Sequence, residues 1–178
     1  MEYVDVLDSS GRPLGRTKPK SEVHRDGDWH GAAHVWIMNK ERRILLQRRS
    51  HTKENWPDLW DVSVAGHISA GEEPVEAALR EAQEELGVRL APSDCRYLFS
   101  IVEQVALHNG SYLDNEYHHV FLVEKDLDFG DIKFMDGEVA DVRLVEVGEL
   151  QRDLITDPSG FVPHPEEYRR LFEVLQGS

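Results

Sequence analysis

The chain has 178 residues, of which 34 are Asp or Glu and 20 are Lys or Arg, and its formal net charge at pH 7 is −14. This length fits one domain, and a hydrophobic content of 40% excludes an intrinsically disordered chain. The negative charge argues against a nucleic-acid partner, because the chain repels polyphosphate unless a bound cation intervenes.

The N-terminal third of the sequence predicts two β-hairpins. Residues 3–7 alternate in polarity and meet a turn, and we expect a hairpin over residues 1–17. Residues 17–29 are polar and predict a loop. Two apolar runs, 32–38 and 44–47, flank a polar turn and predict the second hairpin.

A strand, a loop and a helix follow. The strand covers residues 62–68, and the helix begins at Pro74, which is favoured in a first helical turn. The helix ends near Leu86, because Gly87 readily takes the left-handed conformation that ends helices.

The remaining sequence predicts alternating strands and helices. We expect strands over 97–107, 117–124 and 139–147, a loop over 108–116, a helix over 148–155 and a C-terminal helix over about 165–176. Since the strands come mostly as hairpins, we predict an α+β fold, an α/β/α sandwich with a mixed β-sheet, formed by residues 1–178 as one domain.

The helix over 74–86 carries an unusual group of acids. Its apolar face is expected to contain Val75, Ala78, Leu79, Ala82 and Leu86. Glu81, Glu84 and Glu85 lie on the flank beside it, with Glu85 off the buried stripe. The alternative interpretation is a solvated charged face. However, no base lies between residues 81 and 87, and grouped carboxylates without His or Cys select Mg²⁺ or Mn²⁺.

The same region resembles the Nudix box, Gly-x5-Glu-x7-Arg-Glu-aliphatic-x-Glu-Glu-x-Gly-aliphatic, over residues 66–88. The matching residues are Gly66, Glu72, Arg80, Glu81, Glu84, Glu85 and Gly87, and Ala82 is smaller than the usual aliphatic residue. The resemblance implies a Nudix-type sandwich and a Mg²⁺- or Mn²⁺-dependent pyrophosphohydrolase. Its substrate would be a small-molecule diphosphate, a nucleoside diphosphate linked to another group, X.

The resemblance also implies roles for these residues. Glu81, Glu84, Glu85 and the carbonyl of Gly66 would bind the metal ion, and Glu81 would also deprotonate the attacking water. Glu72 and Arg80 would brace the loop and the helix.

Flanking segments are similar to isopentenyl diphosphate isomerases, which share the Nudix fold. This similarity places His24, His30, His67, Asp114 and Glu116 at or near metal-ligand positions, with Glu116 also a candidate general base. It places Arg49 and Lys53 near diphosphate contacts, and Arg48 completes this basic patch. Ala65 stands where the isomerases carry a catalytic cysteine, and a methyl group cannot transfer a proton. Hydrolysis is therefore favoured over isomerisation.

Several alternatives stay open at this point. The chain could hydrolyse or isomerise a prenyl diphosphate, or it could be an inactive domain that senses a diphosphate. His30 and His67 could be ordinary hydrogen-bonded histidines, and Asp136, Glu138 and Asp141 are candidates for an additional acid. A homodimer is an alternative to a monomer.

Cysteine content and hydropathy indicate the cellular compartment of the protein. A lone cysteine, Cys95, cannot form an internal disulfide, and no window of 18 residues is apolar and uncharged. We expect a cytoplasmic protein without a membrane partner.

Overall fold

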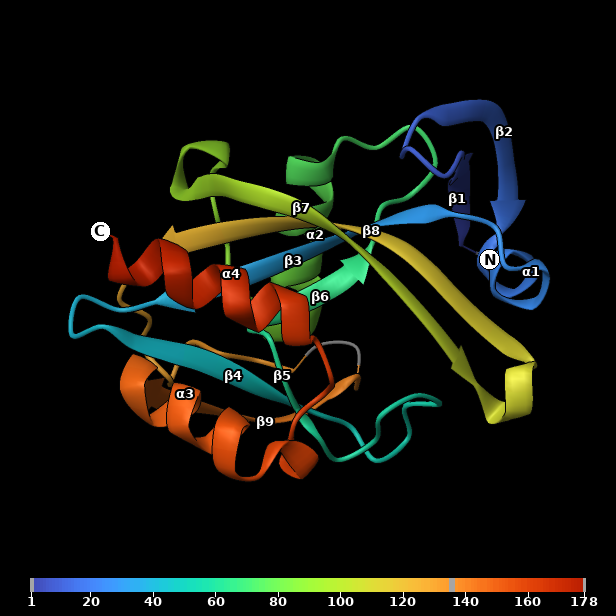
Figure 1. The fold of residues 1–178 in the computed structure, drawn as a ribbon. Coiled ribbons are helices and arrows are strands. Elements are labelled where there is room, and N and C mark those ends of the chain that lie inside the picture. Colours follow the sequence, from blue (N-terminus) through green and yellow to red (C-terminus); the bar gives the residue numbers. More distant parts are fainter. Residues whose placement is uncertain (1, 135–136, 178) are drawn as a thin grey trace.

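A computed structural model describes residues 2–134 and 137–177 (Figure 1). The strands are β1 (Tyr3–Leu7), β2 (Pro13–Pro19), β3 (His30–Met38), β4 (Arg43–Arg49), β5 (Trp60–Asp61), β6 (Val64–His67), β7 (Cys95–Leu107), β8 (Tyr112–Glu124) and β9 (Val139–Glu146). The helices are α1 (Lys20–Asp26), α2 (Pro74–Leu86), α3 (Val147–Thr156) and α4 (Pro165–Gln176).

Strand β3 organises the main sheet. The sheet has seven strands, and its continuous path runs β5-β4-β3-β8-β7. β3 pairs parallel with β8 and antiparallel with β6 and β4, and β9 pairs antiparallel with β4. The predicted mixed sheet is therefore confirmed. A separate two-stranded sheet is formed by β1 and β2.

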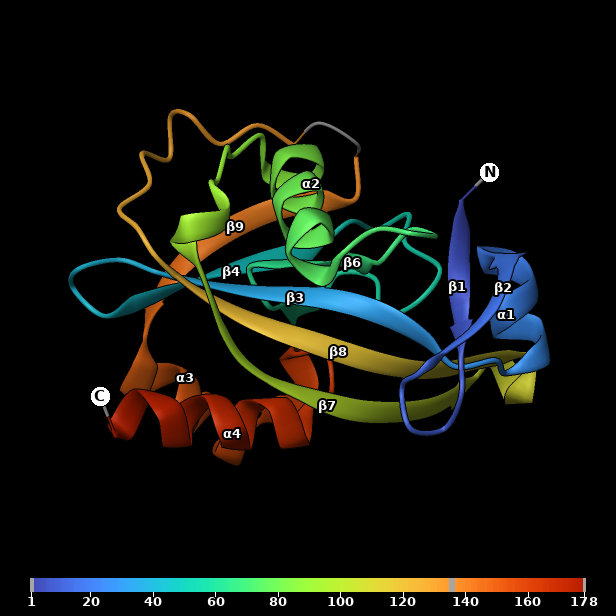
Figure 2. The same cartoon turned by 90° about the horizontal axis from the view of Figure 1, so that it is seen from above.

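The sheet is covered on both faces, as the α/β/α prediction requires. Helix α2 lies on one face, whereas α3 and α4 lie on the other (Figure 2). One buried cluster includes Ala78, Ala82 and Leu86 of α2, and a second includes Leu171 and Leu175 of α4. In the described part of the chain, no helix combines the length and the apolar character needed to cross a membrane.

Two predicted loops are largely regular structure. In the range 17–29, β2 continues to Pro19, and α1 follows and ends at Gly27 with φ of 70°. Val23 of α1 is buried in a cluster with Val4 and Val6 of β1. This contact with β1 stabilises a short helix that the polar sequence does not predict. In the range 108–116, β8 begins at Tyr112, because the long hairpin with β7 extends the pairing to that point.

Helix α2 has the predicted ends but a different buried face. Gly87 has φ of 68°, as expected for a residue that ends a helix. Leu79 is only half-buried and lies outside both buried clusters, so its assignment to the packed face was wrong. Glu85 is 3% exposed, so its placement off the buried stripe was also wrong. The helix turns its alanines toward the sheet, and this rotation brings Glu85 inward.

Candidate metal and diphosphate site

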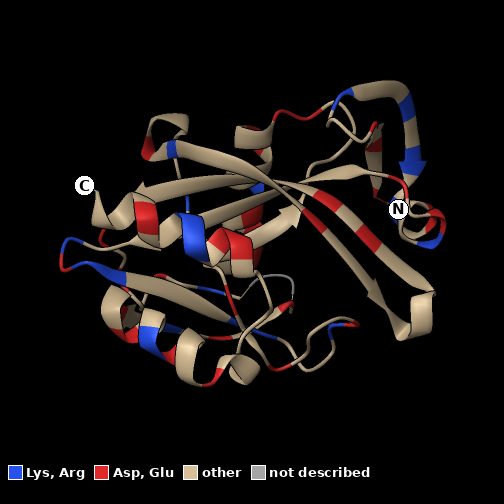
Figure 3. Ribbon diagram, in the orientation of Figure 1, with Lys and Arg blue, Asp and Glu red and all other residues tan. Residues whose placement is uncertain are grey.

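A polar pocket of about 820 Å³ opens beside the N-terminal part of β3, the strand β6 and helix α2. Acidic residues of β7, β8 and α2 line it, among them Glu103, Glu116 and Glu81. The acidic positions of β7 and β8 are the red segments of these strands in Figure 3. Among the residues proposed from the sequence, those lining the pocket are Arg49, Lys53, Gly66, His67, Arg80, Glu81, Glu84, Asp114, Glu116 and Glu138.

Arg80 ties the loop before α2 to the helix itself. Its Nε and Nη2 atoms donate to the two oxygens of Glu72, each at 2.9 Å, and Nη2 also donates to the carbonyl of His67 at 2.9 Å. Its Nη1 atom donates to Glu81 at 2.6 Å and to Glu84 at 3.0 Å. This bidentate ion pair fixes both the loop and the orientation of the acidic flank.

Glu85 lies beneath the pocket rather than on its wall. One of its oxygens, Oε2, accepts hydrogen bonds from Gln47 at 3.0 Å and from the backbone N–H of Ala65 at 3.1 Å. Burial, followed by the charge of Glu81, raises the pKa of Glu85 well above its ordinary value. Its Oε1 atom has no hydrogen-bond partner among the described residues, which leaves one oxygen for a cation.

Glu81 is pressed against the backbone at Gly66. A Cβ atom at position 66 would lie 2.0 Å from the carboxyl carbon of Glu81, so only glycine fits there. Burial raises the pKa of Glu81 more than Arg80 lowers it. An acid pair in which burial and mutual repulsion disfavour the charged forms is stabilised by a divalent cation. Glu81, Glu85 and the backbone of Gly66 therefore fit a hard metal ion such as Mg²⁺ or Mn²⁺.

A second group of potential ligands comes from three separate parts of the chain. It consists of His24 of α1, His30 of β3, His67 of β6, and Asp114 and Glu116 of β8, and we call it the histidine cluster. Parallel pairing sets His30 directly beside Glu116. The ligand atoms of the three histidines lie within 4.8 Å of one another, as do those of His30, Asp114 and Glu116.

The histidine cluster has unsatisfied polar atoms that point to a metal ion. The Nδ1 atoms of His24 and His30 approach the carbonyls of Leu113 and Asp28 at 3.4 and 3.1 Å. Their Nε2 atoms, that of His67 and the Oδ1 atom of Asp114 are buried and form no well-aligned hydrogen bond with the described residues, although Asp114 Oδ1 lies 3.2 Å from His24 Nδ1 and Glu116 lies within ion-pair distance of His30 and His67. Imidazoles held at one nitrogen by a carbonyl, with the other nitrogen free, are typical of metal ligands.

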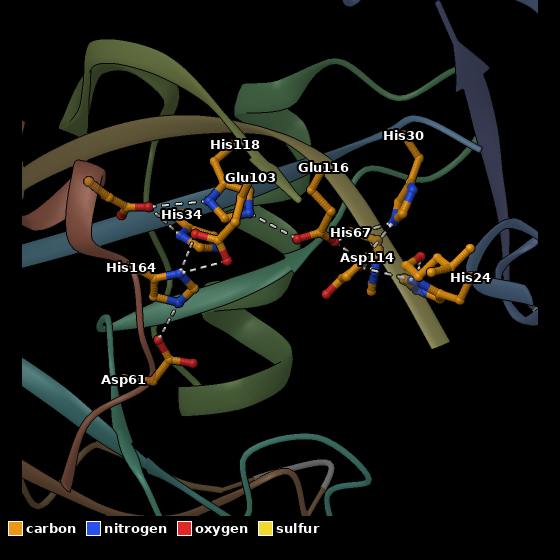
Figure 4. A network of polar contacts seen from close by, with 12 residues as sticks. His24, His30, His34, Asp61, His67, Glu103, Asp114, Glu116, His118 and His164 are labelled. Atoms are coloured by element: carbon orange, nitrogen blue, oxygen red, sulfur yellow. Dashed lines mark hydrogen bonds and ion pairs between the residues drawn. The ribbon is translucent and has the colours of Figure 1, made fainter. Parts of the chain in front are cut away.

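Glu116 connects the histidine cluster to a deeper network (Figure 4). Its Oε1 atom lies 3.3 Å from His30 Nε2 and 3.1 Å from His67 Nε2, while its Oε2 atom lies 2.9 Å from His118 Nε2. Burial would raise the pKa of Glu116, but these histidines outweigh it and hold the pKa well below its ordinary value.

The deeper network was not predicted from the sequence. Glu167 of α4 is fully buried, and its Oε2 atom lies 2.8 Å from His34 Nδ1 and 3.3 Å from His118 Nδ1. Its Oε1 atom accepts from the indole N–H of Trp36 at 2.8 Å. His34 is four residues after His30 on one strand, a spacing that places both side chains on the same face and could have indicated it. No signal pointed to Glu167.

Two of the three bases of the basic patch line the pocket, and the third does not. Arg49 donates to Asp61 at 3.1 Å and to the carbonyl of Asn55 at 3.1 Å, and it lines the pocket. Lys53 lines the pocket as well and pairs with Glu138. Arg48 is not among the lining residues; its guanidinium lies 6.0 Å from the ring of Trp60. The structure therefore separates Arg48 from the other two bases.

The three candidates for an additional acid differ in their position relative to the pocket. Glu138 lines the pocket, whereas Asp141 is on β9 and is not among the lining residues. Asp136 lies outside the described residues.

Comparison with known sequences identifies related proteins. Residues 28–164 match the model of the NUDIX domain. Nudix hydrolase 3 of Arabidopsis thaliana is 38% identical over 98% of this chain, which spans only 23% of that relative. Isopentenyl-diphosphate Delta-isomerase of Escherichia coli is 28% identical, and the match covers 91% of this chain and 86% of the isomerase. His24 and Glu167 lie outside the range that the domain model matches.

The fold is similar to that of solved structures. A protein of Deinococcus radiodurans, DR0079, superposes with a TM-score of 0.73 at 20% identity, and the match covers 95% of this chain and 98% of that structure. At this identity the similarity concerns the fold alone.

Proposed function

The chain belongs to the Nudix family, and from this premise we propose that it hydrolyses the diphosphate bond of a small molecule, a nucleoside diphosphate linked to a further group X. Members of this family are generally pyrophosphohydrolases that act on nucleoside diphosphate derivatives. The observation that carries the proposal is that Glu81 and Gly66 meet on the wall of one pocket, with Glu85 directly beneath them on the N–H of Ala65.

We assign the residues of α2 and β6 to metal binding. Glu81, Glu84, Glu85 and the Gly66 carbonyl would hold Mg²⁺ or Mn²⁺. When bound, the ion would supply positive charge to the diphosphate oxygens and acidify a water molecule. Glu81 would accept the proton of the attacking water, while Arg80 and Glu72 keep Glu81 in place through the ion pairs described above.

The bases and the histidine cluster complete this assignment. Arg49 and Lys53, which line the same pocket, would contact phosphate oxygens. His24, His30, His67, Asp114 and Glu116 would hold a second divalent ion, for which imidazole nitrogens favour Mn²⁺ or Zn²⁺ over Mg²⁺. Isomerisation is not proposed, because Ala65 leaves the pocket without an acid at that position.

A substrate panel tests the proposal. The protein would be incubated with Mg²⁺ or Mn²⁺ and with nucleoside diphosphate sugars, nucleoside triphosphates or isopentenyl diphosphate, and monophosphate or phosphate release would be measured. Glu85→Gln should lower turnover by about two orders of magnitude, as expected for loss of a metal ligand. Conversion of isopentenyl to dimethylallyl diphosphate would instead support an isomerase, and tight binding without turnover would support a sensor.

The number of bound ions tests the histidine cluster separately. We expect His30→Gln to remove one Mn²⁺ site in a titration followed by electron paramagnetic resonance, while Glu85→Gln weakens the other. His119→Gln is a matched control, because His119 alternates to the opposite face of β8 from His118. An unchanged stoichiometry in His30→Gln would contradict a metal ion in this cluster.

A further inference from the structure

The inner end of the pocket, beyond the proposed metal ligands, has its own set of polar side chains. They are His34, Asp61, Glu103 and His164, and we call this set the inner subsite. All four line the pocket. They come from β3, β5, β7 and the residue before α4, so separate elements bring them together.

His34 is held so that one ring nitrogen is available to a ligand. The residue is 4% exposed, and its Nδ1 atom lies 2.8 Å from the carboxylate of buried Glu167. A carboxylate accepts, so Nδ1 of His34 is the donor in this bond and Nε2 is left for a ligand. Within residues 2–134 and 137–177, Nε2 of His34 has no hydrogen-bond partner.

Glu103 offers a hydrogen-bond acceptor to a ligand. Both of its oxygens approach the same atom, Nδ1 of His164, at 3.2 and 3.0 Å. The other nitrogen of His164 lies 3.3 Å from Asp61, which Arg49 also contacts. A carboxylate can accept about four hydrogen bonds, so the bond from His164 leaves Glu103 able to accept others. The side chain of Glu103 is 21% exposed, and that exposed part faces the pocket.

The inner subsite adjoins the proposed diphosphate position. Antiparallel pairing sets His34 beside Ala65, the residue before Gly66, on neighbouring strands. Arg49, proposed to contact phosphate, is bonded to Asp61 of the inner subsite at 3.1 Å. A diphosphate bound between Gly66 and Arg49 would therefore lie next to the inner subsite, within reach of which we place one of its substituents.

We propose that the inner subsite binds a hydroxyl-rich part of the substrate, such as a pentose, whose hydroxyl groups form hydrogen bonds with Glu103 and with Nε2 of His34. The inference rests on the proposed function for the position of the diphosphate. Glu103 needs a donor from the ligand, and a hydroxyl group, which both donates and accepts, also suits Nε2 of His34. An alkyl group would strip water from these two groups without replacing its hydrogen bonds, and about a 10- to 100-fold loss in affinity follows for such an unpaired buried group.

Two five-carbon compounds with the same diphosphate test this inference. Ribose 5-diphosphate carries hydroxyl groups, and isopentenyl diphosphate carries none. We expect kcat/KM with Mg²⁺ to favour the ribose compound by about 10- to 100-fold in the unaltered protein. A ratio of one or below would overturn the inference.

Measuring affinity without turnover separates this test from the test of hydrolysis. With Ca²⁺ in place of Mg²⁺, calorimetry would measure the Kd of each compound. If neither compound is cleaved but the ribose compound binds more tightly, the inner subsite stands, and the nucleotide panel described above decides the proposed hydrolysis. Equal affinities overturn the inner subsite whether or not cleavage occurs.

Substitutions show which residues cause the preference for the ribose compound. His34→Leu and Glu103→Leu should each lower the ratio between the two compounds by about 10-fold, because each removes one hydrogen-bonding group. Glu103→Gln keeps an acceptor oxygen and should keep most of the ratio. Ile155→Ser, at a side chain 76% exposed on α3, is the control that should leave it unchanged. A ratio within one variant does not depend on the folded fraction, so an unchanged ratio in both leucine variants overturns the inference.

Discussion

The side-chain amide of Gln47 donates a hydrogen bond of 3.0 Å to the carboxylate of Glu85, and both residues are buried. The bond joins the centre of β4 to the last turn of α2. Together with the N–H of Ala65 at 3.1 Å, it occupies Oε2 and leaves Oε1 for a metal ion. Gln47 therefore positions a proposed metal ligand without reaching the pocket itself.

The first prediction concerns this positioning. Gln47→Leu should lower kcat by about 10-fold or more and raise the Mg²⁺ concentration at half-maximal rate, because Glu85 loses one of the two donors that fix it. Gln104→Leu makes the same chemical change at an exposed residue of β7. Steady-state kinetics over a Mg²⁺ titration provide the measurement. A purely structural role for Gln47 would lower stability and leave the Mg²⁺ dependence unchanged.

The second prediction concerns Gly66. Gly66→Ala should lower turnover by about 100-fold, because its Cβ atom would lie 2.0 Å from the carboxyl carbon of Glu81 and must displace that side chain. The melting temperature should change little, since the displaced group is the end of a flexible side chain. Gly148→Ala is the matched control, as a Cβ atom there meets only Arg152 at 3.8 Å. Normal turnover in Gly66→Ala would remove this contact from the mechanism.

The Nudix box was predictable because its residues need only local geometry. Glu72, Arg80 and Glu81 lie on one loop and one helix, so their spacing along the chain already determines which side chains meet. The histidine cluster was assigned from resemblance, since its geometry depends on parallel pairing of β3 with β8. Spacing within a strand does not specify which distant strand lies beside it.

The inner network was beyond sequence reasoning for a related physical reason. His34 and Glu167 are 133 positions apart, and they meet only because α4 packs across the sheet. A single Glu near the start of an amphipathic helix resembles a capping or surface acid. Its burial becomes evident only when the tertiary structure places two histidines and an indole around it.

The third prediction tests the corrected burial of α2. Leu86→Ala should lower the free energy of unfolding by about 2–5 kcal/mol, because Leu86 is fully buried in the cluster against the sheet. Leu79→Ala, the same change on the same helix, should cost about 1 kcal/mol or less, because Leu79 is half-buried and outside both clusters. Urea unfolding of the two variants measures the difference. Equal losses would show that the helix packs by a different face.

The fourth prediction concerns the pH dependence of stability at His164. Its two nitrogens lie 3.0 Å from Glu103 and 3.3 Å from Asp61. Burial would lower the pKa of His164, but the hydrogen bonds to these carboxylates outweigh burial and raise the pKa well above 6.5. The rings of His34, His118 and Tyr168 also face it, with centroids at 5.2, 5.6 and 6.0 Å.

A pKa that is higher in the folded state than in the unfolded chain makes the protein less stable as the pH rises. The folded protein binds the proton more tightly than the unfolded chain, so the stabilisation is fully present below pH 6.5 and is lost as the pH rises through the folded pKa. The free energy of unfolding of the unaltered protein should therefore fall above pH 6.5, and this decline should be shallower in His164→Gln. Since His118 has a pKa raised in the same direction, to about 10, part of the decline should persist in the variant. Denaturant unfolding across this range gives both slopes, and identical slopes would show that His164 is not held charged between Asp61 and Glu103.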